Sequence, residues 1–170
     1  MLLDHPPWKD VPKFILDIPY QSTEERLDYL GDQLREFVTF VVKHSGRELD
    51  MDHFKAVCEE ANKAYSLMNE FQNLKRAIPC PSLPLWGTLA YDVARLLAPG
   101  LPEATAWMEK LVKVHERRVK EKQGIDGVDE KIRYIWFDIV PFYGDKLFTR
   151  VAEELGAVVI MDMFAYNPPW

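Results

Sequence analysis

Two aspartates are the residues of this sequence whose types and positions first suggest chemistry. Asp17 ends, and Asp138 interrupts, an apolar segment of the kind that forms a buried strand. A carboxylate in such a place needs hydrogen-bond partners, because burying it alone is costly. Backbone N–H groups could supply those partners, or the carboxylates could face a substrate. We favour the backbone partners and keep both aspartates as candidates for a substrate cleft.

A proline–aromatic segment is the second candidate, because it follows a predicted strand. The run Ile132–Val140 is almost continuously apolar, as is Ala157–Met161, and apolar residues at helical spacing lie between them. Gly156 stands where the C-terminus of that helix takes a left-handed residue. This pattern predicts a βαβ unit of a parallel sheet. Ligands of open α/β sheets lie beyond the carboxyl ends of the strands. The likeliest functional edges are therefore Pro141-Phe142-Tyr143 and Asp162-Met163-Phe164.

Other catalytic and cofactor signatures are missing from the sequence. The nucleotide motifs GxGxxG and GxxxxGK[ST] do not occur, nor do HExxH and GxSxG. The four histidines are dispersed, and we interpret each as a surface or helix-terminal residue. Cys58 fits a small buried side chain within a helix. Cys80 lies in a proline-rich loop, where it could bind a metal or react, but no second cysteine stands at ligand spacing. On chemistry alone, the residues disclose no reaction.

The composition limits the class of protein. With 170 residues, 48% of them apolar, and a net charge of −6, the chain is globular and acidic. The acidic balance argues against binding to nucleic acid or to an anionic membrane. No apolar run reaches the ~18–20 residues of a spanning helix, and residues 1–20 lack the pattern of a signal peptide. Cytoplasmic localisation is the default expectation.

The remaining sequence predicts one short strand and four helices. Residues 13–18 have a strand pattern that ends at Pro19. A capping box with Ser22 as the cap precedes the first helix, whose apolar stripe we expect to be buried. The other helices are expected to start near Asp50, at Leu85 and at Pro102. The predicted fold class is α/β: a mainly helical middle region followed by a βαβ unit of an incomplete, Rossmann-like parallel-sheet domain.

The order of several short motifs resembles one known family. These motifs are Asp17-Ile18-Pro19, Asp32-Gln33-Leu34-Arg35, Ser45-Gly46-Arg47-Glu48-Leu49-Asp50, Asn62-Lys63-Ala64 and Ile139-Val140-Pro141. In this order and spacing they are similar to the D-component family of 2-hydroxyacyl-CoA dehydratases and class I benzoyl-CoA reductase subunits. The resemblance covers about residues 13–164.

The resemblance implies a domain organisation and a function. Residues 1–20 would hold the terminal strand of a first α/β domain, 21–123 a helical linker region, and 130–170 the beginning of a second α/β domain. The chain would be a partial subunit, inactive alone, of an enzyme that dehydrates or reduces a CoA thioester by radical chemistry. Pro141, Phe142 and Tyr143 would line the interdomain cleft, with Asp17 and Tyr20 facing it. Asp138 stands where the family more often has a small residue.

The family also implies a cofactor and partners. Its subunits pair with a paralogous subunit, receive electrons from an ATP-dependent activator, and typically hold a [4Fe–4S] cluster on three cysteines. The regions that carry those cysteines lie upstream of the Asp-x-Pro strand and downstream of the second strand, so the cluster ligands are not expected in this chain. The substrate would be an acyl-CoA.

Two other functions remain open. The helices could form a non-catalytic binding or assembly module that presents a surface to another subunit. A self-sufficient small α/β enzyme is the weaker alternative, because three strands are too few to complete a sheet.

Overall fold

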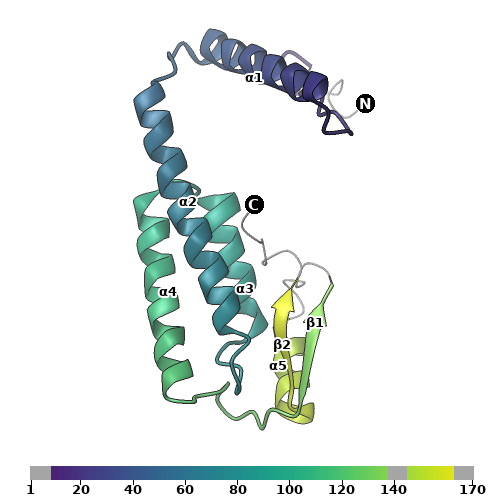
Figure 1. Ribbon diagram of the computed structural model, residues 1–170, viewed down its shortest axis with the longest axis vertical. Coiled ribbons are helices and arrows are strands. Elements are labelled where there is room, and N and C mark those ends of the chain that lie inside the picture. The colour runs from purple at the N-terminus through teal and green to yellow at the C-terminus, as the bar shows by residue number, and fades with distance from the viewer. Residues whose placement is uncertain (1–8, 138–144, 163–170) are drawn as a thin grey trace. The chain divides into compact units, whose positions relative to one another are not determined.

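The computed structural model describes residues 9–137 and 145–162 (Figure 1). The chain divides into two compact units, Met1–Met51 and Asp52–Trp170. The predicted site residues Asp138, Pro141, Phe142 and Tyr143 lie outside the described residues. No helix in the described ranges is both long enough and apolar enough to cross a membrane.

The first unit contains one long helix, α1 (Glu24–Ser45), which ends at Gly46 in the left-handed conformation. The predicted capping box is wrong. Thr23, in extended backbone, is the N-cap, and its side chain makes no capping hydrogen bond. The Thr23 carbonyl accepts the first helical hydrogen bond, from the N–H of Leu27, so the helix starts one residue later than Ser22 would require.

The strand predicted for residues 13–18 is not formed, and this segment is irregular. A strand needs a neighbour to pair with its backbone groups, and the two strands in the described part of the chain pair with each other. Phe14 instead packs on α1, with its ring centroid 5.5 Å from those of Phe37 and Phe40. Aromatic contact with the helix therefore replaces the expected pairing in a sheet.

The apolar stripe of α1 is not buried, contrary to the sequence-based expectation. The helix has no buried residue. Leu30 of the stripe is partly buried, and the exposed fractions of the other stripe residues run from 37% at Val38 to 57% at Leu27. The spacing correctly predicted an amphipathic helix. It could not predict what covers the apolar face, because periodicity reports only which residues share a face.

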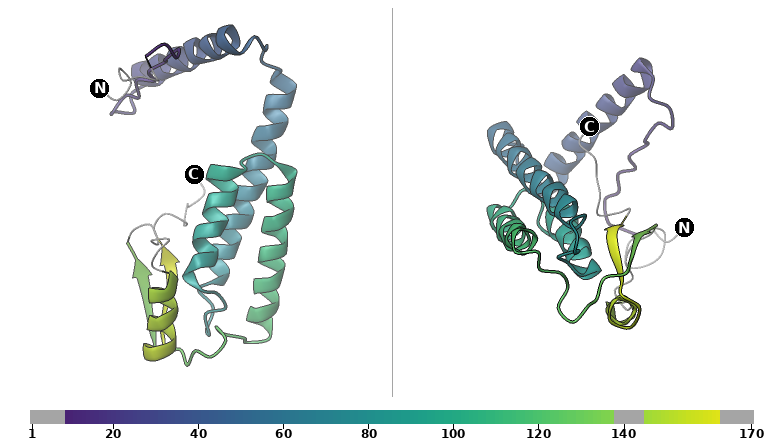
Figure 2. Two further views of the ribbon diagram at one scale, coloured as in Figure 1. Left: turned by 180° about the vertical axis from the view of Figure 1, so that it is seen from behind. Right: turned by 60° about the horizontal axis from the view of Figure 1, so that its bottom comes forward.

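The second unit begins with the helices α2 (Met51–Leu74), α3 (Pro84–Tyr91) and α4 (Pro102–Lys120). A π-helical segment, Asp92–Leu97, continues α3. The four predicted helices are therefore confirmed. In both views of Figure 2, α2, α3 and α4 lie side by side around one apolar core. The buried members of this core are Ala64, Met68, Phe71, Ala90, Ala94, Met108, Leu111 and Val112.

The predicted βαβ unit is present at the end of the second unit. Strands β1 (Ile132–Trp136) and β2 (Ala157–Asp162) are parallel, and α5 (Asp145–Leu155) connects them (Figure 1). Phe148 and Ala152 of α5 are buried against Val159 and Val158 of β2 respectively. The predicted α/β class is confirmed. The sheet has two strands in the described part of the chain, fewer than the usual four to six, in agreement with an incomplete domain.

Gly156 gives a direct test of the predicted turn between α5 and β2. Its φ is +64°, and a Cβ there would overlap the carbonyl oxygen of Asp129. Gly156→Ala should lower the free energy of unfolding by more than about 2 kcal/mol, because backbone strain and this overlap add. The matched control is Gly127→Ala, whose φ is +77° but whose Cβ would meet open space. Urea denaturation should show a loss of about 1 kcal/mol in unfolding free energy for Gly127→Ala. Equal losses for the two variants would refute the steric argument.

Candidate functional site

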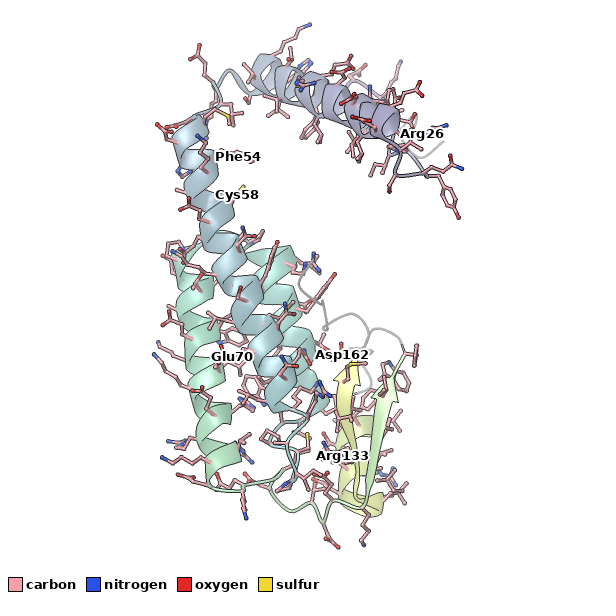
Figure 3. All side chains as sticks on the ribbon, viewed as in Figure 1. Arg26, Phe54, Cys58, Glu70, Arg133 and Asp162 are labelled. Carbon is pink, nitrogen blue, oxygen red and sulfur yellow. The ribbon has the colours of Figure 1, made fainter. Side chains whose placement is uncertain are left out.

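The carboxyl end of β2 carries a buried ion pair. Asp162 ends the strand and is 2% exposed, and its Oδ2 lies 3.5 Å from Nζ of Lys75, which is 0% exposed. Lys75 follows the last turn of α2, so the pair joins the helical part of the second unit to the sheet. Figure 3 shows Asp162 at the end of β2 that faces the helices.

Two further residues close this site. Gln72, one turn before Lys75, is 1% exposed, and neither amide atom has a hydrogen-bond partner among the described residues. A Cβ on Gly87 of α3 would lie 2.9 Å from both Asp162 Oδ2 and Lys75 Nζ, so only glycine lets α3 approach the pair this closely. These residues form a buried polar cluster, and we name Gln72, Lys75, Gly87 and Asp162 the strand-end cluster.

Burial sets the electrostatics of this region. Desolvation lowers the pKa of Lys75 below its ordinary value, and the charge of Asp162 partly opposes that shift. Burial likewise raises the pKa of Cys80, whose Sγ lies 3.4 Å from the Ser82 carbonyl oxygen as a hydrogen-bond donor. A cysteine in this state is a thiol and a poor nucleophile. The sequence left open that Cys80 reacts or binds metal, and its burial favours neither role.

A second charged pair fixes the connector between α2 and α3. Arg133 of β1 donates to the carbonyls of Arg76 (2.7 Å) and Ala77 (3.0 Å) and forms an ion pair with Glu130. Glu130 also accepts a hydrogen bond from the backbone N–H of Cys80. Each partner satisfies backbone groups that the irregular connector cannot satisfy itself. These bonds hold the chain that follows Lys75 against β1.

His115 of α4 is buried, which corrects the interpretation of all four histidines as surface or helix-terminal residues. It is 4% exposed, its Nδ1 lies 2.8 Å from the Leu111 carbonyl oxygen, and its ring packs edge-on against Phe71. Burial is the main cause that lowers its pKa below the ordinary value. The imidazole is therefore neutral near pH 7.

The other sequence-predicted residues in the described ranges are not gathered into a buried site. Asp17 is exposed and accepts a hydrogen bond from the Tyr29 hydroxyl at 2.9 Å, so the expected buried strand carboxylate is wrong. This bond raises the pKa of Tyr29. Tyr20 is fully exposed. Cys58, expected to be buried, is exposed.

Comparison with known proteins identifies the family. Residues 5–170 match the family model described as 2-hydroxyglutaryl-CoA dehydratase, D-component. The chain belongs to this family. It is also similar to the (R)-2-hydroxyglutaryl-CoA dehydratase subunit alpha of Acidaminococcus fermentans, with 29% identity over 139 residues. That alignment covers 78% of this chain but 28% of the relative, so the chain spans less than a third of the relative's length. The suspected resemblance is confirmed.

The donor groups of this family member do not fit an iron–sulfur cluster. The full sequence has two cysteines, one fewer than the three thiolates that the family resemblance implies. Cys58 is exposed and Cys80 is buried, and no group of three potential metal ligands occurs in the described ranges. We therefore assign no step of the reaction to a cluster held by this chain.

Sequence reasoning missed most of the strand-end cluster and His115. It placed Asp162 at a functional edge, but not Lys75, Gln72 or Gly87. One signal was available: Ala64, Met68, Phe71 and Lys75 recur every three or four residues, which puts a lysine on the buried face of α2. A lysine at a core position predicts a buried partner of opposite charge.

The Lys75–Asp162 pair should make a large, coupled contribution to stability. Lys75→Met and Asp162→Asn should each cost about 3–5 kcal/mol, because each removes one charge of a buried ion pair. The double variant should lose at least about 1 kcal/mol less than the sum of the single losses. Urea denaturation of all four proteins gives this coupling energy.

The exposed pair Glu109 and Lys113, 3.8 Å apart on α4, provides the matched control. The corresponding Glu109→Gln and Lys113→Met cycle should give a coupling energy below about 0.5 kcal/mol. Equal coupling energies in the two cycles would contradict the large contribution assigned to the Lys75–Asp162 pair.

His115 predicts a loss of stability in acid. Because the pKa of His115 is lowered in the folded chain, the unfolded chain binds a proton first as the pH falls below about 6.5. The stability contributed by the neutral imidazole is present above that pH and is lost as the pH falls towards the folded pKa. His115→Gln should flatten this part of the stability–pH curve measured by urea denaturation. An unchanged slope in His115→Gln would refute the assignment.

Proposed function

We propose that this chain forms part of the catalytic component of a 2-hydroxyacyl-CoA dehydratase and is inactive alone. The observation that carries the proposal is the match of residues 5–170 to the D-component family. The reaction would remove water from a 2-hydroxyacyl-CoA thioester, and the named relative suggests a 2-hydroxyglutaryl group. The proposal includes a second reaction, the reduction of an aromatic CoA thioester, as in the related benzoyl-CoA reductases.

The proposed substrate cleft lies beyond the carboxyl ends of β1 and β2. Parallel strands place ligands at this edge, and Pro141, Phe142 and Tyr143 follow β1 in the chain. We propose that these three residues shape the cleft around the thioester and exclude water from it. Asp17, Tyr20 and Asp138 are further candidates for contact with the substrate.

The strand-end cluster has a positioning role in this proposal. Lys75 has no exposed surface and so cannot touch a substrate. Its ion pair fixes the last residue of β2, whose carboxyl end belongs to the proposed edge. The cluster therefore supports the cleft and is not itself catalytic.

The finer parts of the proposal concern groups outside this chain. In the family the thioester receives a single electron, which permits loss of the hydroxyl group as hydroxide and of an otherwise unacidic β-proton. The product radical then gives the electron back, so the dehydration is redox-neutral overall. We propose that other segments of the subunit, or a paralogous subunit in a heterodimer, hold the [4Fe–4S] cluster. An ATP-dependent activator would deliver the electron, and the whole system would operate in the cytoplasm. The domain organisation of residues 1–20, 21–123 and 130–170 belongs to the same proposal.

An assembly role is the second candidate function. The observation that favours it is α1, which has no buried residue and an apolar stripe from Leu27 to Val41. Exposed apolar stripes of this kind mark interaction surfaces. In this alternative the chain contributes a docking surface and no part of the substrate cleft.

A chimera distinguishes the two functions. This chain should replace the matching segment of the Acidaminococcus fermentans subunit alpha, produced anaerobically with its partner subunit and activator. We expect dehydration of 2-hydroxyglutaryl-CoA by the chimera, and a fall in kcat/KM of at least about tenfold with Phe142→Ala. The control variant Lys113→Gln, on the exposed face of α4, should leave kcat/KM unchanged.

The isolated chain gives the second arm of this experiment. After anaerobic treatment with iron and sulfide it should bind less than one cluster, since it lacks a third cysteine. A stoichiometric [4Fe–4S] cluster in the isolated chain would contradict the proposal. A chimera that folds, assembles and loads its cluster, yet whose activity does not respond to Phe142→Ala, would favour the assembly role.

A further inference from the structure

A groove on the second unit is lined by none of the four residues of the strand-end cluster. It has a volume of about 450 Å³, within the range of about 300–1,000 Å³ typical of small-molecule sites. One wall is a single face of α4, with Trp107, Leu111, His115 and Arg118 at helical spacing. Trp86, in the first turn of α3, also lines the groove.

His115 lines this groove and carries a hydrogen-bond acceptor. Its Nδ1 lies 2.8 Å from the Leu111 carbonyl oxygen, and a carbonyl can only accept. Nδ1 must therefore carry the proton of the neutral ring, and Nε2 carries a lone pair. Nε2 makes no hydrogen bond within the described ranges, and His115 lines the groove. A ligand with an N–H group can satisfy it.

Two tryptophans and a lysine that line the groove suit a ligand with a flat ring and an anionic group. Trp86 is 41% exposed although it is large and apolar, and Trp107 is partly buried beside it along the groove. Lys110 forms no ion pair with any described residue. Arg118 is already engaged, because it donates to the Gly124 carbonyl and pairs with Asp126 at 3.1 Å. Arg118 thus holds the rim of the groove, and Lys110 remains available for the anion.

We propose that this groove binds a purine nucleotide. The base stacks on the indole of Trp86, an N–H of the base donates to His115 Nε2, and Lys110 receives the phosphate. A phosphate alone would leave the indoles and Nε2 unused, and an apolar ring alone would leave Nε2 and Lys110 unused. The nucleotide could be free or could be the nucleotide part of coenzyme A. The inference concerns binding by this chain and does not depend on the proposed function.

Calorimetric titration of the whole chain tests the site, with ADP as the probe. We expect a Kd at or below about 1 mM, with adenosine and ribose 5-phosphate each binding at least about tenfold more weakly, because each lacks one half of the ligand. Trp86→Ala should weaken ADP binding by about tenfold or more, as loss of base stacking does. Lys110→Gln should weaken it by about threefold or more, and the matched control Lys113→Gln should have no effect.

Coenzyme A is the arm that identifies the source of the nucleotide. Binding as tight as that of ADP, and equally sensitive to Trp86→Ala, assigns the site to coenzyme A; binding of ADP but not of coenzyme A assigns it to a free nucleotide. If Trp86→Ala does not fold, Trp86→Phe replaces it in the test. We expect Trp86→Phe to fold and to bind ADP within about threefold of the unmodified chain, because phenylalanine still stacks on the base. No saturation by ADP, equal affinities for ADP and ribose 5-phosphate, or ADP binding indifferent to the change at Trp86 would overturn the proposal.

Discussion

The second unit depends on a charge pair that water does not reach. Lys75 and Asp162 are 87 positions apart in the sequence, one after the last turn of α2 and one at the end of β2, and both are buried. Removal of either side chain breaks a buried ion pair while the other side chain stays buried, which costs several kcal/mol. The pair therefore specifies where the end of β2 must lie relative to α2. Gly87 completes this arrangement, because any larger residue would enter the space of the two charged groups.

The same constraint links the helices to the proposed chemistry. The carboxyl end of β2 is one side of the edge at which a parallel sheet binds ligands. Arg133 and Glu130 fix the connector that follows Lys75, so the pair acts on a chain segment that is itself held in place. In a dehydratase subunit this arrangement would keep the cleft in shape while other segments supply the cluster. That division of labour agrees with a chain that has two cysteines and spans 28% of its relative.

Local pattern predicted the parts of this fold that depend on local physics. The four helices and the βαβ unit follow from apolar periodicity, and Gly156 follows from the left-handed residue that ends α5. The strand at residues 13–18 failed because pairing is a property of two segments, and one segment cannot predict its partner. The exposed stripe of α1 failed for the same reason. The buried pair and the neutral His115 depend on contacts between distant segments, which periodicity alone does not encode.

Hydrogen exchange of the β2 amides tests the central role of the Lys75–Asp162 pair most directly. In Lys75→Met the amides of residues 157–162 should exchange about 100-fold faster than in the unmodified chain, which corresponds to about 3 kcal/mol of lost protection. The amides of α4 in the same variant should be affected less, because α4 packs on α2 and α3 through the apolar core. Unchanged protection of β2, or equal losses in β2 and α4, would contradict the account.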